Sequence, residues 1–267
     1  MTDLAASRRR MVQDQVQGRG VRDARLLEAM ERVARERVVP SEHRPHVFED
    51  RPIPVAEGVI LPQAQITAYQ IEALALAPGS PRPAGVGTGC DAAVMAAMDA
   101  EVFTLAPDGP TSERTAGLLA DPGHDRVHVR PDADLRAWEE KAPFDAILLR
   151  GAVAAPRPEL FHPLARGGRM VATIGRHRPA QELVRDTSDA QGRIDREDLA
   201  DIRLVPPRDL ETGEERAGPA PARVIERLRA SEQLLPRGRA KEQLLVGHPP
   251  CSRHRCRHVS AAGLAPQ

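Results

Sequence analysis

Three glycines at alternate positions, Gly85, Gly87 and Gly89, stand directly before an alanine-rich run that ends at Met98. Glycine lets a backbone turn tightly and pass close to a ligand. The first turn of a helix also offers amide N–H groups that have no partner within the helix. A glycine turn followed by a helix therefore predicts a site for a nucleotide-like ligand. The same turn can also simply join a strand to a helix, so it needs support from the surrounding elements.

The segments before the turn predict a helical cap. Residues 3–17 and 23–39 have helical periodicity, and Asp23 can cap the second helix, whose apolar stripe faces a core. Residues 43–62 hold too many prolines for regular structure and predict a loop. A further helix is expected over residues 64–77.

After the turn, strands alternate with helical segments, which is typical of a parallel sheet covered by helices on both faces. The chain ends this pattern with residues 180–206, which predict antiparallel strands at one edge of the sheet. The expected strands lie at 101–106, 126–130, 144–150 and 169–175, and the expected helices at 111–120 and 157–168. This pattern predicts an α/β protein with a helical cap of residues 1–60, a Rossmann-like domain of residues 61–206 and a tail of residues 207–267 that is helical and then disordered.

Composition narrows the class of protein. The 267 residues carry a formal net charge of +0, which argues against a nucleic-acid binder. No stretch reaches the roughly 20 apolar residues of a membrane span. Three cysteines do not make a disulfide framework, and no secretory signal is recognisable, so we expect a cytoplasmic protein, and we expect a monomer.

Several segments, in order, resemble the protein-L-isoaspartate O-methyltransferases over roughly residues 8 to 206. The most specific are "MVQDQVQGRGVRDARLLEAMERVARERVVP" and "FEDRPIPVAEG", followed by "GVGTG", "APFDAILL" and "LARGGRMVATIG". The resemblance implies a Rossmann-like fold that binds S-adenosyl-L-methionine. It also implies methyl esterification of L-isoaspartyl residues in damaged proteins, which is a protein-repair activity.

The resemblance assigns site residues position by position. The substrate loop carries Pro62 and Gln63 at the catalytic positions, with Ile60 and Pro62 where the family has hydroxyl side chains. The positions implied to bind the cofactor are Gly85, Gly87, Thr88, Gly89, Ala106 and Asp132.

Two of these positions depart from the family pattern. Gly85 and Ala106 stand where the family has acidic residues, the second of which holds the ribose. Asp91 and Asp108 are candidates to replace that ribose carboxylate. These departures keep a second hypothesis open, in which a catalytically impaired relative binds a peptide or a partner through the same cleft.

Two histidine-containing segments have simpler interpretations. The ligand types at Cys251, His254, Cys256 and His258 suit a metal, but their spacing is too tight for the chain to turn around a zinc ion, so no metal site is expected. His43 and His46 are interpreted as solvated loop histidines rather than catalytic groups.

Overall fold

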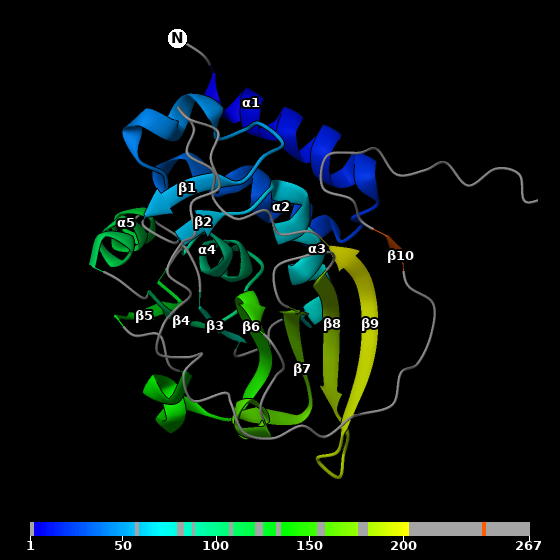
Figure 1. Ribbon diagram of the computed structural model, residues 1–267. Coiled ribbons are helices and arrows are strands. Elements are labelled where there is room, and N and C mark those ends of the chain that lie inside the picture. The colour runs from blue at the N-terminus through cyan, green and yellow to red at the C-terminus, as the bar shows by residue number, and fades with distance from the viewer. Residues whose placement is uncertain are drawn as a thin grey trace, which may run out of the picture.

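The structure is a computed structural model that describes residues 3–56, 59–78, 83–86, 89–106, 109–120, 125–131, 135–153, 158–175, 181–202 and 242–243. Its strands form one large sheet and a small hairpin (Figure 1). Parallel strands make up one part of the large sheet: β3 (Pro83–Val86), β4 (Val102–Leu105), β5 (Val127–Arg130), β6 (Phe144–Val153) and β7 (Leu164–Ile174). The edge adds β8 (Gln181–Ser188) and β9 (Ile194–Ile202), both antiparallel to their preceding strand, and the short β10 (Glu242–Gln243).

The strand order contains a reversal that matters for function. The order is β10-β9-β8-β7-β6-β3-β4-β5, so the chain runs outward from β3 through β4 to β5 and then returns to place β6 on the other side of β3. In open α/β sheets, ligands bind outside the carboxyl ends of the strands at such a switch point. The carboxyl ends of β3 and β6 therefore mark the expected site.

Helices cover one face of this sheet in two layers (Figure 1). The inner helices are α3 (Ala64–Leu74), which contacts β6 and β7, and α4 (Cys90–Ala97), which contacts β4. Beyond them lie α1 (Leu4–Met11) and α2 (Ala24–Arg32), while α5 (Gly109–Leu119) packs beside α4. The Asp23 carboxylate accepts hydrogen bonds from the amides of Arg25 and Leu26, which confirms the predicted cap of α2.

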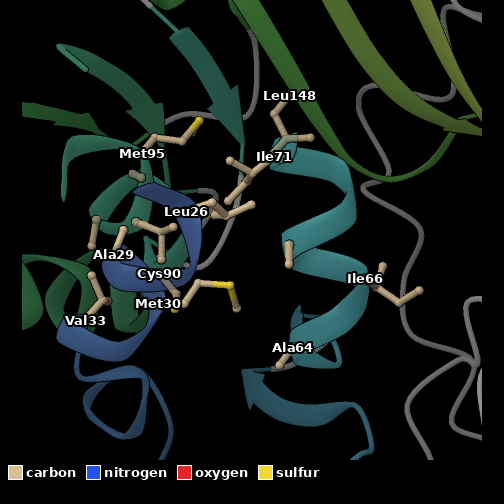
Figure 2. Packing of buried hydrophobic residues seen from close by; sticks show 14 of the residues in the cluster. Leu26, Ala29, Met30, Val33, Ala64, Ile66, Ile71, Cys90, Met95 and Leu148 are labelled. Carbon is tan, nitrogen blue, oxygen red and sulfur yellow. The ribbon is translucent and has the colours of Figure 1, made fainter. Parts of the chain in front are cut away.

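The core between these layers is aliphatic (Figure 2). Leu26 and Met30 of α2 point toward α3 and α4, and Ile71 of α3 lies against Leu148 of β6. Each side chain is at most 5% exposed, and burying one such side chain contributes about 1.5–3 kcal/mol. The predicted stripe of α2 is thus the face that holds the cap on the domain.

The structure corrects the prediction that residues 43–62 are irregular. Ser41–His46 form a 3-10 helix, and β1 (Ile53–Ala56) pairs antiparallel with β2 (Val59–Leu61). Ile53 and Leu61 are paired and almost fully buried, so the gain from burial outweighs the amide hydrogen bonds that proline cannot make.

The predicted helix over residues 157–168 is also wrong. Among the described residues 158–168, helical structure is limited to the 3-10 helix Pro158–Phe161, and β7 already begins at Leu164. Pro163 cannot continue a helix, and its carbonyl accepts a hydrogen bond from the Phe144 amide at 2.7 Å, which starts the β6–β7 pairing.

Coverage of the second face differs from the expectation as well. In the part of the chain that the structure describes, this face carries the 3-10 helices Leu135–Lys141 and Pro158–Phe161 rather than α-helices. Trp138 packs on this face of the sheet. Its indole N–H donates to the Thr104 carbonyl at 3.1 Å, and its ring lies edge-on to Phe103. A large aromatic side chain here covers area that a longer helix would otherwise bury.

Candidate active site

The glycine turn lies at the predicted place, between β3 and α4. Gly85 pairs with Thr104 of β4 and Leu148 of β6, and Gly89 precedes α4 with a φ of +81°. A Cβ atom at Gly89 would lie 2.4 Å from Thr115 Cγ2 of α5. Glycine is therefore required at position 89 by its backbone conformation and by the close approach of α5. Gly87 and Thr88 lie outside the described residues.

The predicted substrate loop lies close to the start of α4. Pro62 and Gln63 connect β2 to α3, and Gln63 is buried at the start of that helix, where its carbonyl accepts the Thr67 amide at 3.1 Å. The Pro62 carbonyl accepts a hydrogen bond from Arg35 Nη2 at 3.3 Å. Because Arg35 also lines a water-sized cavity with Leu61, Thr67 and Cys90, it joins the loop to the start of α4.

The predicted ribose position has no polar side chain. Ala106 follows the last residue of β4, is buried, and donates its amide to the Arg130 carbonyl at 3.0 Å. A methyl group offers no acceptor to a hydroxyl group. Asp108, a candidate to replace the ribose carboxylate, and Asp132, which the family resemblance places near the adenine, lie outside the described residues.

A buried polar cluster adjoins the switch point, and Arg150 is its centre. The Arg150 guanidinium forms a two-point ion pair with the Asp91 carboxylate, donating from Nε to Oδ2 at 2.8 Å and from Nη2 to Oδ1. It also donates from Nη1 to the Gln70 side-chain oxygen and from Nη2 to Thr67 Oγ1 at 3.3 Å. Asp91, a candidate ribose acceptor by sequence, is therefore occupied by an arginine of β6.

Burial shifts the pKa values of both Arg35 and Cys90 toward the uncharged form. Desolvation by burial lowers the pKa of Arg35, although Cys90, Asp91 and Glu36 oppose that shift. Burial, followed by the negative charge of Asp91, raises the pKa of the Cys90 thiol to about 12. Cys90 is consequently a neutral thiol at physiological pH, and the charges that remain belong to arginines and carboxylates.

The other candidates from the sequence lie elsewhere. His43 and His46 belong to the 3-10 helix Ser41–His46, and His46 is half-exposed with its Nδ1 2.7 Å from Glu49 Oε1. The Cys251–His258 cluster is outside the described residues. Across the described ranges, no group of three or more His, Cys, Asp and Glu side chains is arranged to hold a metal ion.

Sequence patterns alone missed Arg150, Gln70, Thr67 and Arg35. One signal was present, since Arg150 places a charge at the end of the otherwise apolar run "FDAILL". Gln70 and Thr67 gave no such signal, because they lie on a helix whose buried face includes both polar and apolar residues.

The reversed strand order, the glycine turn at the carboxyl end of β3 and the helical cap define a class of protein, the Rossmann-like methyltransferases, which confirms the predicted fold class. A Plasmodium falciparum crystal structure assigned to protein-L-isoaspartate O-methyltransferase, in complex with S-adenosyl-L-homocysteine, matches with a TM-score of 0.62 and 20% identity. The match covers 73% of this chain and 94% of that one.

Sequence comparison names the family. Residues 6–212 match the model of the protein-L-isoaspartate(D-aspartate) O-methyltransferases. A protein-L-isoaspartate O-methyltransferase of Methylorubrum populi is 41% identical over 208 residues, which cover 77% of this chain and 96% of that protein. A Rhodopseudomonas palustris relative of the same name is 39% identical over 206 residues, covering 77% and 84%. The chain belongs to the protein-L-isoaspartate O-methyltransferase family.

Proposed function

We propose that the protein transfers the methyl group of S-adenosyl-L-methionine to the free carboxylate of L-isoaspartyl residues in damaged proteins. The observation that carries this proposal is the family match over residues 6–212, with relatives covered almost from end to end. The neighbour's complex with S-adenosyl-L-homocysteine supports the choice of cofactor, since this is the demethylated product of that methyl donor.

The residues of the carboxyl edge fit the amino-acid end of this cofactor. Gly89 starts α4 without a side-chain cap, so the helix presents its first-turn amides and the positive end of its dipole toward the turn. The ribose end differs from the family, since Ala106 offers no carboxylate. We assign the cofactor to Gly85, Gly87, Thr88 and Gly89, with Ala106 beside the ribose and Asp132 near the adenine.

The proposed reaction requires little acid–base catalysis by the protein. When bound, the cofactor supplies a methyl group already activated on a sulfonium. The isoaspartyl carboxylate is ionised at neutral pH and needs no general base. The chain must therefore hold that carboxylate in line and keep water out, and orientation of this kind supplies much of the rate enhancement in bimolecular reactions.

The loop of Pro62 and Gln63 is our candidate for holding the substrate. Gln63 is buried and carries an amide that can donate to a carboxylate, whereas proline has no side-chain donor. The apolar side chains of Ile60 and Pro62 and the methyl group of Ala106 favour one alternative function, in which the protein binds an isoaspartyl peptide or a partner without turnover.

Titration calorimetry with S-adenosyl-L-homocysteine separates the two functions. The enzyme requires a dissociation constant in the micromolar range, and absence of heat at millimolar ligand would refute it.

We further propose that the protein acts as a monomer in the cytoplasm, without nucleic-acid or membrane partners. Support comes from its balanced charge, and the described helices include none with the length and apolar character of a membrane span.

A further inference from the structure

Arg150 is held at the switch point of the sheet by groups from two helices. Its own strand, β6, pairs with β3 up to Leu149, which lies opposite Val86, the last residue of β3. Asp91 belongs to the first turn of α4, and Thr67 and Gln70 belong to α3, directly after the substrate loop. The guanidinium thus lies between the two segments that the proposed function assigns to cofactor and substrate.

The cluster carries more positive than negative charge. Arg35 extends this cluster, because the charges of Asp91, Glu36 and Arg150 all act on it. Within the described residues, the extended cluster contains the guanidiniums of Arg8, Arg35 and Arg150. Its two carboxylates are Glu36, which pairs with Arg8 at 2.7 Å, and Asp91, which pairs with Arg150. Arg35 is only 4% exposed, and its Nε has no hydrogen-bond partner in the described part of the chain. The Nη2 atom of Arg35 donates to the neutral Pro62 carbonyl, but among the described residues no carboxylate forms an ion pair with Arg35. A buried charge without a counter-charge is costly, so this arrangement is suited to one additional anion.

A carboxylate is the anion that the geometry favours. Asp91 already shows that a carboxylate binds Arg150 through two parallel N–H donors, and this two-point geometry is specific to planar anions. The proposed substrate loop, in contrast, has Ile60 and Pro62 at the positions where the family has hydroxyl side chains, so these positions offer no hydroxyl donor. Arg150 supplies strong donors where the loop does not.

We propose that Arg150 binds a ligand carboxylate at the carboxyl edge of the sheet, and that Asp91 orients its guanidinium and competes with that carboxylate. This inference rests on the proposed function. Two ligands carry the group, the isoaspartyl residue of the substrate and the amino-acid end of the cofactor. Gln70 and Thr67 are positioning residues, because each accepts a hydrogen bond from Arg150 and limits its orientation.

Two pairs of ligands, in each of which only one member carries the carboxylate, test the proposal by calorimetry without any need for turnover. S-adenosyl-L-homocysteine carries the carboxylate, and 5′-methylthioadenosine lacks the whole amino-acid end. An isoaspartyl peptide is compared with the same peptide in which the free carboxylate is a carboxamide. The first pair tests the cofactor as the source of the carboxylate and the second tests the substrate.

Arg150→Gln removes charge-assisted hydrogen bonds to the ligand carboxylate. In at least one pair, the affinity for the ligand with the carboxylate is therefore expected to fall by about 10- to 100-fold. The affinity for the ligand without the carboxylate should change by less than about twofold. Asp91→Asn removes the competing charge and tightens the same ligand by about 3- to 10-fold. Arg150→Lys restores the charge without the two-point geometry and gives an intermediate affinity. Arg196→Gln, at a paired arginine of β9, is the matched control and leaves all four affinities unchanged.

The double variant Asp91→Asn with Arg150→Gln keeps the test valid if the single variant fails to fold, because it removes both buried charges together. It is expected to lose the preference for the charged ligand. If Arg150 has a purely structural role, its replacement weakens the binding of charged and neutral ligands equally, or of neither. Either result would overturn the proposal.

The outcome separates this proposal from the proposed function. If the unaltered protein binds neither adenosine compound, the methyltransferase function fails, and the peptide pair alone decides the role of Arg150. If the unaltered protein binds S-adenosyl-L-homocysteine but Arg150→Gln leaves both charged ligands unaffected, the role of Arg150 fails and the methyltransferase function stands. If the unaltered protein binds none of the four ligands, both fail.

Discussion

Alanine at position 89 would carry two separate energetic costs. The φ of +81° at Gly89 is left-handed, and a residue with a Cβ atom loses roughly 1–2 kcal/mol there. The new Cβ atom would also lie 2.4 Å from Thr115 Cγ2 and 2.5 Å from its Oγ1, far inside van der Waals contact. Thr115 is fully buried, so the overlap costs about 1–3 kcal/mol more. Gly89→Ala should lower the free energy of unfolding by about 2–5 kcal/mol in total.

Gly192→Ala is the matched control for the backbone cost alone. Gly192 has a φ of +83° in the turn between β8 and β9, and no atom lies within 4 Å of its ideal Cβ position. Its replacement should cost about 1–2 kcal/mol. The difference between the two variants isolates the contact of α5 with the glycine turn.

Urea denaturation followed by tryptophan fluorescence measures both losses, because Trp138 is the single tryptophan of the chain and is buried against the sheet. Adding Thr115→Ala to Gly89→Ala removes the two nearest atoms and should recover part of the stability. Equal losses for Gly89→Ala and Gly192→Ala would refute the reasoning, since they would show that α5 does not confine the turn.

Three further predictions concern charge, reactivity and the substrate loop. Arg196→Ala leaves the fully buried Asp186 carboxylate without its cation and should cost about 3–5 kcal/mol in urea denaturation. Glu197→Gln, at an exposed cross-strand pair of the same hairpin, should cost less than about 1 kcal/mol, and equal costs would contradict the prediction. Burial raises the pKa of the Cys90 thiol to about 12, which keeps the thiol protonated at pH 8. In a variant whose other two cysteines are replaced by serine, Cys90 should therefore react with a disulfide reagent at pH 8 only after the protein unfolds. Rapid reaction of the folded protein would count against its burial. Pro62→Ser adds a hydroxyl donor to the loop and should raise kcat for methyl transfer about tenfold; an unchanged kcat would show that the missing donor is not limiting.

Much of the fold follows from local patterns in the sequence. The apolar run of residues 144–150 predicts a strand buried on both faces, and the structure confirms it as part of β6. Asp23 and the stripe behind it predict α2, although the helix ends at Arg32, before the expected position. These features depend on residues within one or two turns of each other, which is why the pattern suffices.

The errors arise where a distant partner decides the conformation. Ile53 forms a strand because Leu61 pairs with it under the cap, a gain that the proline-rich sequence does not reveal. Leu164 extends a strand because Phe144 lies beside it. The contact of Arg150 with Asp91 spans 59 positions of the chain, so local periodicity cannot predict it. The site residues at the glycine turn came from the family resemblance, and their roles stay predictions.

Transfer of a labelled methyl group to a synthetic isoaspartyl peptide tests the central claim most directly. The protein is incubated with methyl-labelled S-adenosyl-L-methionine and either the isoaspartyl peptide or the same peptide with a normal aspartyl linkage, and the base-labile methyl ester is measured as released methanol. The proposed function predicts ester on the isoaspartyl peptide and none above background on the normal peptide. Absence of ester on both peptides, or equal labelling of the two, would contradict it.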